Sequence, residues 1–286
     1  MSHPTVSVIM PCYNQAIYLT DSIQSLQAQT LSDWECIIVS DDSPDDTEQV
    51  ALEFCKYDPR IKYVWQKNAG PSSARNKGIS LAQGEFILPL DADDKIGNRY
   101  LEEAVNVFET QDSVSLVYCQ AEKFGGVHEF WKLADFRYPD LLKYNMVFCS
   151  ALFRKTDWER VGGYDETLRK GWEDWEFWIR LLDEHSKVVK LDAVHFYYRI
   201  REQSRQASMN NSDFEEIGWY IFLKHLPVYR KFFTNPIRTA LEHTDLQVEN
   251  ESLRNNLANV FGSTSYKIGN KMVSRLSFLK ELQPKK

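Results

Sequence analysis

Two aspartates, Asp91 and Asp93, stand one residue apart directly after the apolar run 85–90 and could hold a metal ion. A hard divalent cation that carries substrate phosphates takes one or two protein carboxylates and leaves its other positions to phosphate oxygens and water. One acid could reach the metal while the other binds a ribose hydroxyl or a metal-bound water. A solvated acidic turn that caps the next helix is the competing interpretation. The strand before the two acids favours the metal site.

A second acidic pair, Asp41 and Asp42, follows the β-rich run 34–40. Asp41 could accept a hydrogen bond from a base N–H, such as the imide of uracil. Pro11 and Tyr13 close the first β-rich run and offer backbone carbonyls and an aromatic face to the same base. Helix capping by the acids of this turn is the alternative.

Arg75 lies in a segment of small residues, 69–78, that runs into a predicted helix. An arginine in this place could bind a diphosphate or order nearby carboxylates. An ordinary surface arginine is the competing interpretation.

Acid–base chemistry is predicted for Glu173 and Asp174, which lie in the aromatic segment 171–178. Transfer of a glycosyl group with inversion needs one base to deprotonate the acceptor hydroxyl, while a metal stabilises the departing phosphate. Asp174 falls in the first turn of a predicted helix, whose dipole favours the ionised carboxylate that a base requires. Glu173 could be the base instead, because sequence spacing does not separate adjacent acids. Trp172 and Trp175 could flank a bound sugar or belong to the core.

The elements that must position these residues alternate between strand and helix through the first half of the chain. Strands are predicted at 6–10, 34–40, 61–65 and 85–90, and helices at 18–29, 50–57 and 74–82. Such alternation predicts an α/β fold with a Rossmann-like, doubly wound and mainly parallel sheet. Open sheets of this kind bind ligands at the carboxyl edge of their strands, and both acidic clusters follow predicted strands.

The second half is less regular. Strands are predicted at 114–120, 146–153 and 188–199, between Trp-rich and polar stretches that could face an acceptor. We expect one domain over 1–235, whose halves meet at about residue 95, and a helical extension over 236–286.

The composition excludes several classes of protein. The 286 residues are 43% hydrophobic, which is enough for a sizeable core, and the net charge of −7 lacks the positive field of a general nucleic-acid binder. Five unclustered cysteines in apolar runs indicate reduced core thiols of a cytosolic protein. No apolar run reaches the roughly 18 to 20 residues of a membrane-spanning helix, and the first residues do not begin a signal peptide.

The extension carries two amphipathic patterns. Leu246, Leu253 and Val260 are seven residues apart, with Leu257 between them, which indicates a weak coiled-coil seam of under three heptads and a homo-oligomer. From Tyr266 onward an apolar stripe is flanked by basic residues: Ile268, Met272, Leu276, Leu279 and Leu282 with Lys267, Lys271, Arg275 and Lys280. A basic amphipathic helix can lie on anionic lipid as a peripheral membrane contact or pack on protein.

Taken together, these segments resemble glycosyltransferase family 2. They follow that family's order over roughly residues 4–205: 6–14 with Pro11 and Tyr13, 40–43 with Asp41, 70–78 with Arg75, 91–94, and 173–174. The resemblance implies a GT-A fold and an inverting enzyme with a nucleoside-diphosphate sugar donor, UDP favoured, and Mn²⁺ or Mg²⁺. It implies a hexosyl- or N-acetylhexosaminyltransferase that acts on a glycan or lipid-linked acceptor in cell-surface polysaccharide biosynthesis. The place of action would be the cytoplasm, at the inner face of the membrane.

The resemblance also implies a role for each residue. It implies Pro11, Tyr13 and Asp41 around the nucleoside, Arg75 and Asp91 beside the ribose and diphosphate, Asp93 with Asp91 on the metal, and Asp174 as the base. The segment 198–204 is similar to the closing segment of the family, in which Arg201 and Ser204 would contact phosphate oxygens. Some relatives have a histidine where Arg201 stands, which argues against a metal-binding histidine here.

Two other classes of function are weighed against this one. A sugar nucleotidyltransferase would carry a glycine-rich phosphate loop after the first strand, and the segment 11–15 has no glycine. A non-catalytic nucleotide-sugar or glycan-binding protein would be expected to have a damaged donor site or base, whereas all the expected acids are present.

Overall fold

The computed structural model describes residues 3–201, 205, 208–233, 235–268 and 270–271. The chain divides into two compact units, Met1–Lys224 and His225–Lys286. The sequence places its change of texture slightly later, at 235–236. Each unit is described by itself.

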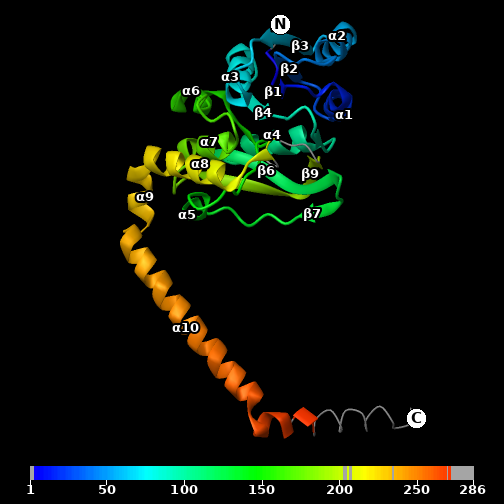
Figure 1. The fold of residues 1–286 in the computed structure, drawn as a ribbon. Coiled ribbons are helices and arrows are strands. Elements are labelled where there is room, and N and C mark those ends of the chain that lie inside the picture. Colours follow the sequence, from blue (N-terminus) through cyan, green and yellow to red (C-terminus); the bar gives the residue numbers. More distant parts are fainter. Residues whose placement is uncertain (1–2, 202–204, 206–207, 234, 269, 272–286) are drawn as a thin grey trace, which may run out of the picture. The chain divides into compact units, whose positions relative to one another are not determined.

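The first half of the larger unit is a parallel sheet with helices on both faces (Figure 1). Its strands, in the spatial order β3-β2-β1-β4, are β1 (Val6–Cys12), β2 (Trp34–Asp41), β3 (Ile61–Gln66) and β4 (Phe86–Pro89). All eight residues of β2 are buried, as expected for a strand covered on both faces. The helix α3 (Pro71–Leu81) packs on β1 and β2, while α1 (Ala16–Gln27) and α2 (Thr47–Tyr57) lie on the opposite face.

The sheet continues beyond β4 with antiparallel pairings. The further strands are β5 (Lys95–Ile96), β6 (Val114–Gly125), β7 (Glu129–Trp131), β8 (Leu152–Arg154) and β9 (Lys187–Ile200). The order runs β4-β8-β6-β9-β5, with β7 on β6, and only the β6–β9 pair is parallel in this part. The α/β prediction is confirmed. The parallel pairing holds for β1 to β4 and for β6 with β9.

The predicted strand at 146–153 is wrong over most of its length, because only β8 is extended there. Met146, Val147 and Phe148 are buried, yet they belong to an irregular segment. The Val147 carbonyl accepts a hydrogen bond of 3.0 Å from the indole nitrogen of Trp178 rather than from a neighbouring strand. An apolar run therefore reported burial correctly but not strand geometry.

In the described part of the larger unit, five further helices follow: α4 (Tyr100–Thr110), α5 (Tyr138–Leu141), α6 (Lys155–Val161), α7 (Glu173–Leu181) and α8 (Asn211–Lys224). The helix α7 is held by a buried aromatic cluster, in which Phe177 stacks on Tyr164 with ring centroids 4.0 Å apart. Phe153 of β8 packs against Phe177 and Trp178 at 5.3 and 5.7 Å. This packing fixes the helix that carries the predicted base.

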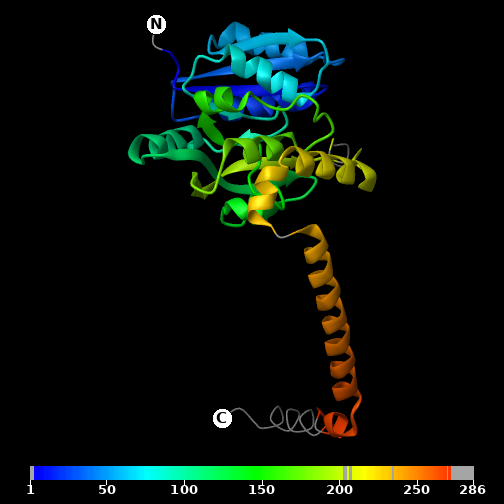
Figure 2. The ribbon, with the colours of Figure 1, turned by 90° about the vertical axis from the view of Figure 1, so that its left-hand side faces the viewer.

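The smaller unit contains α9 (Leu226–Phe232) and α10 (Pro236–Gly262), the latter a continuous helix in both views (Figures 1 and 2). None of the helices in the described part of the chain has the length and apolar character needed to cross a membrane. The basic amphipathic end is predicted from Tyr266 onward. The structure describes its residues 266–268 and 270–271, and the others lie outside the described ones.

Candidate active site

The acidic loop after β4 is pinned from two sides. Ser22 of α1 donates its hydroxyl to the Ala92 carbonyl at 2.8 Å. From β9, the backbone N–H of Arg199 donates to the Asp94 carboxylate at 2.8 Å, and its Nε donates to the Asp93 carbonyl at 2.7 Å. Asp94 is 1% exposed, so it serves the loop and not a ligand. The anchoring leaves Asp91 and Asp93 to face the site.

Arg75 ties Asp91 to α7. Its guanidinium donates from Nη2 to Asp91 Oδ1 at 2.6 Å and from Nη1 to Glu173 Oε1 at 2.8 Å. Arg75 is 1% exposed, whereas the Asp91 side chain is 30% exposed. Burial lowers the pKa of Arg75, but Asp91 and Glu173 outweigh it and hold that pKa well above its usual range. Of the two predicted roles for Arg75, the geometry matches the one that orders carboxylates.

Glu173 is enclosed by two arginines. Its Oε1 accepts from Arg75 and, at 2.6 Å, from Arg205 Nη2, and the residue is 2% exposed. Burial alone would raise the pKa of this carboxyl, but the charges of Arg205 and Arg75 lower it to about 2. A buried carboxylate needs this compensation. Glu173 is therefore a fixed anion with little tendency to take up a proton.

Asp174, the adjacent acid, has a different environment. It is half-buried, and its carboxylate accepts from Asn145 Nδ2 at 2.9 Å and from the Trp175 N–H at 2.8 Å. Burial and the charge of Glu173 raise its pKa to about 6. The helix dipole favours the ionised carboxylate, but burial and the neighbouring acid have the larger effect on its pKa. A carboxylate with a pKa near 6 is largely ionised at neutral pH and is a stronger base than an ordinary aspartate.

Asp93 lies opposite Arg201, which the sequence assigns to phosphate oxygens. Arg201 Nη2 is 2.8 Å from Asp93 Oδ2, and Asp93 is 7% exposed. Burial and the charge of Asp91 raise the pKa of Asp93 to about 6, although Arg201 opposes the shift. Ser204, the other predicted phosphate ligand, lies outside the described residues.

The pair Asp91 and Asp93 fits a divalent cation of the kind that bridges to phosphates. Burial is the main reason for the raised pKa of Asp93, and the charge of Asp91 adds to it; a bound cation would favour the ionised carboxylate. Within the described ranges no group of three or more His, Cys, Asp or Glu side chains could hold a metal ion. Two carboxylates suffice only when phosphate oxygens and water supply the other ligands. The two carboxylates therefore suit a metal ion that binds together with a nucleotide.

The second acidic pair divides in the same way as Glu173 and Asp174. The Asp41 carboxylate accepts three hydrogen bonds, from Gln66 Nε2 at 2.8 Å, the Ala69 N–H at 2.9 Å and the Gly70 N–H at 2.8 Å. Asp41 is 4% exposed and fastens the loop that starts α3. Asp42 is exposed, has a left-handed φ of 62°, and its carboxylate has no hydrogen-bond partner in the described part of the chain.

The predicted nucleoside residues of the first strand lie beside this pair. Pro11 pairs with Val39 in the parallel register of β1 and β2, and Cys12 pairs with Ser40. Tyr13 follows directly, with 51% of its surface exposed. Tyr13 and Asp42 thus have open side chains at this carboxyl edge, while Asp41 is used internally.

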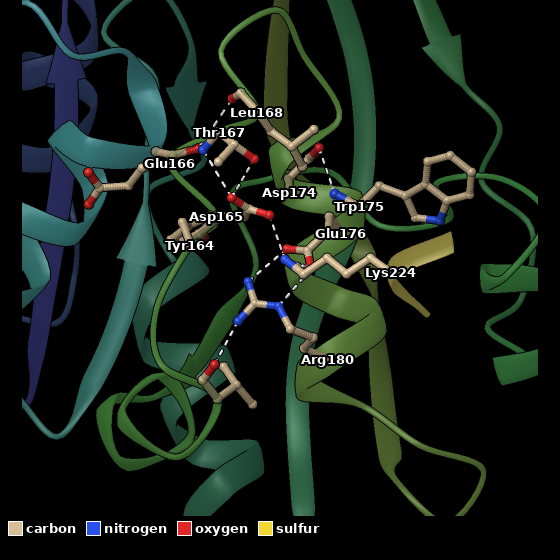
Figure 3. A network of polar contacts seen from close by, with 12 residues as sticks. Tyr164, Asp165, Glu166, Thr167, Leu168, Asp174, Trp175, Glu176, Arg180 and Lys224 are labelled. Atoms are coloured by element: carbon tan, nitrogen blue, oxygen red, sulfur yellow. Dashed lines mark hydrogen bonds and ion pairs between the residues drawn. The ribbon is translucent and has the colours of Figure 1, made fainter. Parts of the chain in front are cut away.

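A polar network around Glu176, two residues after Asp174, braces α7 (Figure 3). Glu176 is fully buried and receives a bidentate pair from Arg180 at 2.8 and 2.7 Å. Lys224 of α8 bridges Glu176 Oε1 at 2.8 Å and the Asp165 carboxylate, which also accepts from Tyr220 at 2.6 Å. The network joins α8 and the loop before α7 to the helix that presents Asp174.

Sequence reasoning did not find three contributors to the site: Arg205, Asn145 and the functional separation of Asp42 from Asp41. Arg205 and Asn145 lie 32 and 29 residues from their partners, and neither belongs to a motif. For Asp42 the signal was available, because two acids ended one strand and only one had room to be internal.

Comparison with known proteins adds the family. The profile of Glycosyl transferase family 2 matches residues 7–166. The chain is 33% identical over 212 residues to the minor teichoic acid biosynthesis protein GgaB of Bacillus subtilis. This match covers 70% of this chain but only 23% of GgaB. The structure resembles that of S. aureus TarS in complex with UDP-GlcNAc, with a TM-score of 0.66, 23% identity, and coverage of 78% of this chain and 66% of the other.

A second structural neighbour is the mannosyltransferase PcManGT from Pyrobaculum calidifontis, in complex with GDP-Man and Mn²⁺. It has a TM-score of 0.56 and 16% identity, and the match covers 95% of this chain and 84% of the other. Both structural likenesses establish the fold, which is GT-A. The family profile extends from β1 through the acidic loop after β4 to the loop before α7. This chain belongs to glycosyl transferase family 2.

Proposed function

We propose that this chain is an inverting glycosyltransferase that moves a sugar from a nucleoside-diphosphate sugar, with UDP favoured, to a hydroxyl of a glycan or lipid-linked glycan. The observation that carries the proposal is the ion-pair chain Asp91–Arg75–Glu173, with links of 2.6 and 2.8 Å. It ties an acid at the donor edge of the sheet to the residue before Asp174. A transferase needs this connection, because donor and base must keep a fixed separation.

We assign the base to Asp174 and a positioning role to Glu173. Both acids begin α7, but the arginines that lower the pKa of Glu173 leave it a poor proton acceptor at neutral pH. Asp174 is half-buried rather than enclosed, and its pKa is raised. Its two hydrogen bonds, from Asn145 and from its own helix, would hold the carboxylate in one orientation.

The reaction then involves one proton and two bonds to carbon. Asp174 would accept the proton of the acceptor hydroxyl as its oxygen attacks the anomeric carbon. The bond from that carbon to the diphosphate oxygen breaks, and the nucleoside diphosphate leaves with the electron pair. Attack opposite the leaving group inverts the anomeric centre. Arg201 would move from Asp93 toward the diphosphate, where a guanidinium binds phosphate oxygens well.

A divalent cation, Mn²⁺ or Mg²⁺, would be held by Asp93 and Asp91 and would neutralise charge on the departing diphosphate. Burial and the charge of Asp91 disfavour the ionised form of Asp93, and a bound cation would offset both effects, which supports Asp93 as the principal ligand. Asp91 would stay attached to Arg75 through Oδ1 and offer its exposed face to the metal or the ribose.

For the nucleoside we propose Tyr13 and Asp42, with Pro11 at the same edge. Asp42, in place of Asp41, would accept a hydrogen bond from the nucleobase, because three hydrogen bonds already occupy most of the Asp41 carboxylate. The exposed ring of Tyr13 would cover a face of the base.

The class of donor and acceptor is supported by the relatives. The solved structures are of TarS in complex with UDP-GlcNAc and of PcManGT in complex with GDP-Man and Mn²⁺, which supports a nucleotide-sugar donor and a metal. GgaB is named for teichoic acid biosynthesis, which supports a cell-surface polymer as the acceptor. We accordingly propose action in the cytoplasm, at the inner face of the membrane, as a hexosyl- or N-acetylhexosaminyltransferase.

The test is a screen of UDP-, GDP- and dTDP-sugars for donor hydrolysis with Mn²⁺, Mg²⁺ or chelator. We expect one donor class to be hydrolysed with metal and not with chelator. NMR of a transfer product should show the opposite anomeric configuration to the donor. Asp93→Ala should abolish the metal dependence of UDP binding. Asp94→Asn is not a suitable control, because Asp94 anchors the loop. Retention of configuration, or full turnover in chelator, would contradict the proposal.

A further inference from the structure

The helix α10 presents a stripe of apolar side chains without a covering surface in the described part of the chain. Leu246, Leu253, Leu257 and Val260 are each exposed over more than half of their surface. The helix is 27 residues long, and most of the stability of a helix comes from packing of an apolar face rather than from intrinsic propensity. A helix of this kind calls for a partner.

The stripe has a heptad register. Leu246, Leu253 and Val260 occupy the d positions, and Asn250 and Leu257 occupy the following a positions. Leucine at d is the preference of parallel two-stranded coiled coils. A single buried asparagine at a fixes register and favours two strands over larger assemblies.

The charges agree with a parallel arrangement. With this register, Glu249 falls at g and Arg254 at the e position of the next heptad. In a parallel dimer each g side chain faces the e side chain five residues later on the other helix, so two Glu249–Arg254 pairs form by symmetry. An antiparallel pair would bring g toward g and e toward e, and this complementarity would be lost.

We propose that α10 forms a parallel, in-register two-stranded coiled coil with α10 of a second copy of this chain. Neither rival occupant matches the stripe as well. A lipid surface would meet Asn250 in the middle of the stripe and Asp245, Glu249 and Glu251 nearby, and anionic headgroups repel such acids. A groove on another protein would have no reason to match the Glu249 and Arg254 spacing. The inference does not depend on the proposed function.

Cysteine cross-linking of the full chain tests the parallel register. At a d position the two side chains of a parallel dimer face each other, so Leu253→Cys should form an interchain disulfide under mild oxidation. The matched control is Asn255→Cys, an f position on the same helix that points away from the partner. The native cysteines are all in the larger unit and are present in both variants. Equal cross-linking of the two variants, or none in Leu253→Cys, would overturn the proposal.

Loss of an apolar side chain tests the interface itself. By light scattering, the full chain should have twice its 33.5 kDa mass at high concentration. Leu253→Asp should weaken dimerisation by about tenfold or more, since it removes one leucine from each helix and places two like charges together. Val248→Asp is the control, because Val248 is 63% exposed but occupies an f position. Equal weakening by both variants, or a monomeric wild type at every concentration, would be contrary to the inference.

The charge pair gives a third measurement. Glu249→Arg and Arg254→Glu should each weaken the dimer, because each brings like charges together at the g and e positions. The double variant should recover most of the loss, since it restores opposite charges with reversed signs. Donor hydrolysis per chain, measured in parallel, reports the catalytic unit separately. Failure of the double variant to recover would remove the parallel pairing.

Discussion

Two pairs of consecutive acids, Asp41-Asp42 at the end of β2 and Glu173-Asp174 at the start of α7, divide their work in the same way. In each pair the first acid is internal: Asp41 is 4% exposed and Glu173 is 2% exposed. The second acid of each pair is more open. The pairs differ in the groups that bind the internal acid. Amide groups of a loop bind Asp41, whereas two guanidinium groups enclose Glu173.

That difference determines what the open acid becomes. Around Asp41 the partners are neutral, so Asp42 has only its own exposure and its left-handed backbone to distinguish it. Glu173 is a buried anion next to Asp174, and its charge contributes to the raised pKa of the neighbour. The internal acid of the second pair therefore tunes the open one, while that of the first pair supports it mechanically. Substitutions in the two pairs can separate tuning from support.

Asp174→Asn should have the largest effect. Loss of a general base costs about 10²- to 10⁴-fold in turnover, and we expect the transfer rate to fall by that amount. UDP binding with metal should be unchanged, because Asp174 does not contact the donor-side acids. The melting temperature should not fall, since ionised Asp174 is disfavoured in the folded state and asparagine removes that charge. Wild-type turnover in this variant would exclude Asp174 as the base.

Glu173→Gln should be the main stability variant. It leaves Arg75, which is 1% exposed, with Asp91 as its remaining acid. The free energy of unfolding should fall by about 3 kcal/mol, at the low end for a broken buried pair because Asp91 still faces the guanidinium. Urea unfolding measures it. Turnover should fall less than in Asp174→Asn, and the reverse order would make Glu173 the base.

Local pattern predicted the parallel half of the sheet well. The strand at 61–65 and the helix at 74–82 differ from β3 and α3 by only a few residues, because alternation and helical spacing are properties of adjacent residues. The division of labour within each acidic pair was not predictable in this way. It depends on Gln66 and Gly70 for Asp41 and on Arg205 for Glu173, which are distant in sequence. The sequence indicated the chemistry of the site but not which neighbour performs it.

Asp41→Ala should have a smaller effect on stability than Glu173→Gln. It removes the acceptor of the Ala69 and Gly70 N–H groups and of the Gln66 amide. The free energy of unfolding should fall by about 2 kcal/mol, because these donors must find water instead. Hydrogen exchange should rise at residues 69–70. Unchanged exchange there would contradict the supporting role of Asp41.

Asp42→Asn should weaken UDP binding by about tenfold, which corresponds to one charge-assisted hydrogen bond. Asparagine tolerates the left-handed backbone of residue 42, so the fold and the free energy of unfolding should be retained. Calorimetric titration with UDP of the wild type, Asp41→Ala and Asp42→Asn distinguishes the roles of the two acids. If Asp42→Asn bound UDP with wild-type affinity, the role of binding the nucleobase would return to Asp41.

The smallest effect is the pH dependence of turnover. Burial and Glu173 raise the pKa of Asp174 to about 6. Above pH 7 nearly all of the Asp174 carboxylate is therefore deprotonated, and this active form is lost as the pH falls through the pKa. With saturating donor and metal, the transfer rate at pH 6 should be about half of its plateau. Glu173→Gln removes the neighbouring negative charge, so its midpoint should move to lower pH. Asp93 also has a raised pKa, but bound metal would keep it ionised. UDP affinity measured over the same pH range reports the protonation of Asp93, so it separates that effect from the protonation of Asp174. A midpoint that stays in place in Glu173→Gln would mean that burial alone sets the pKa of the base and that the pair is not a tuned one.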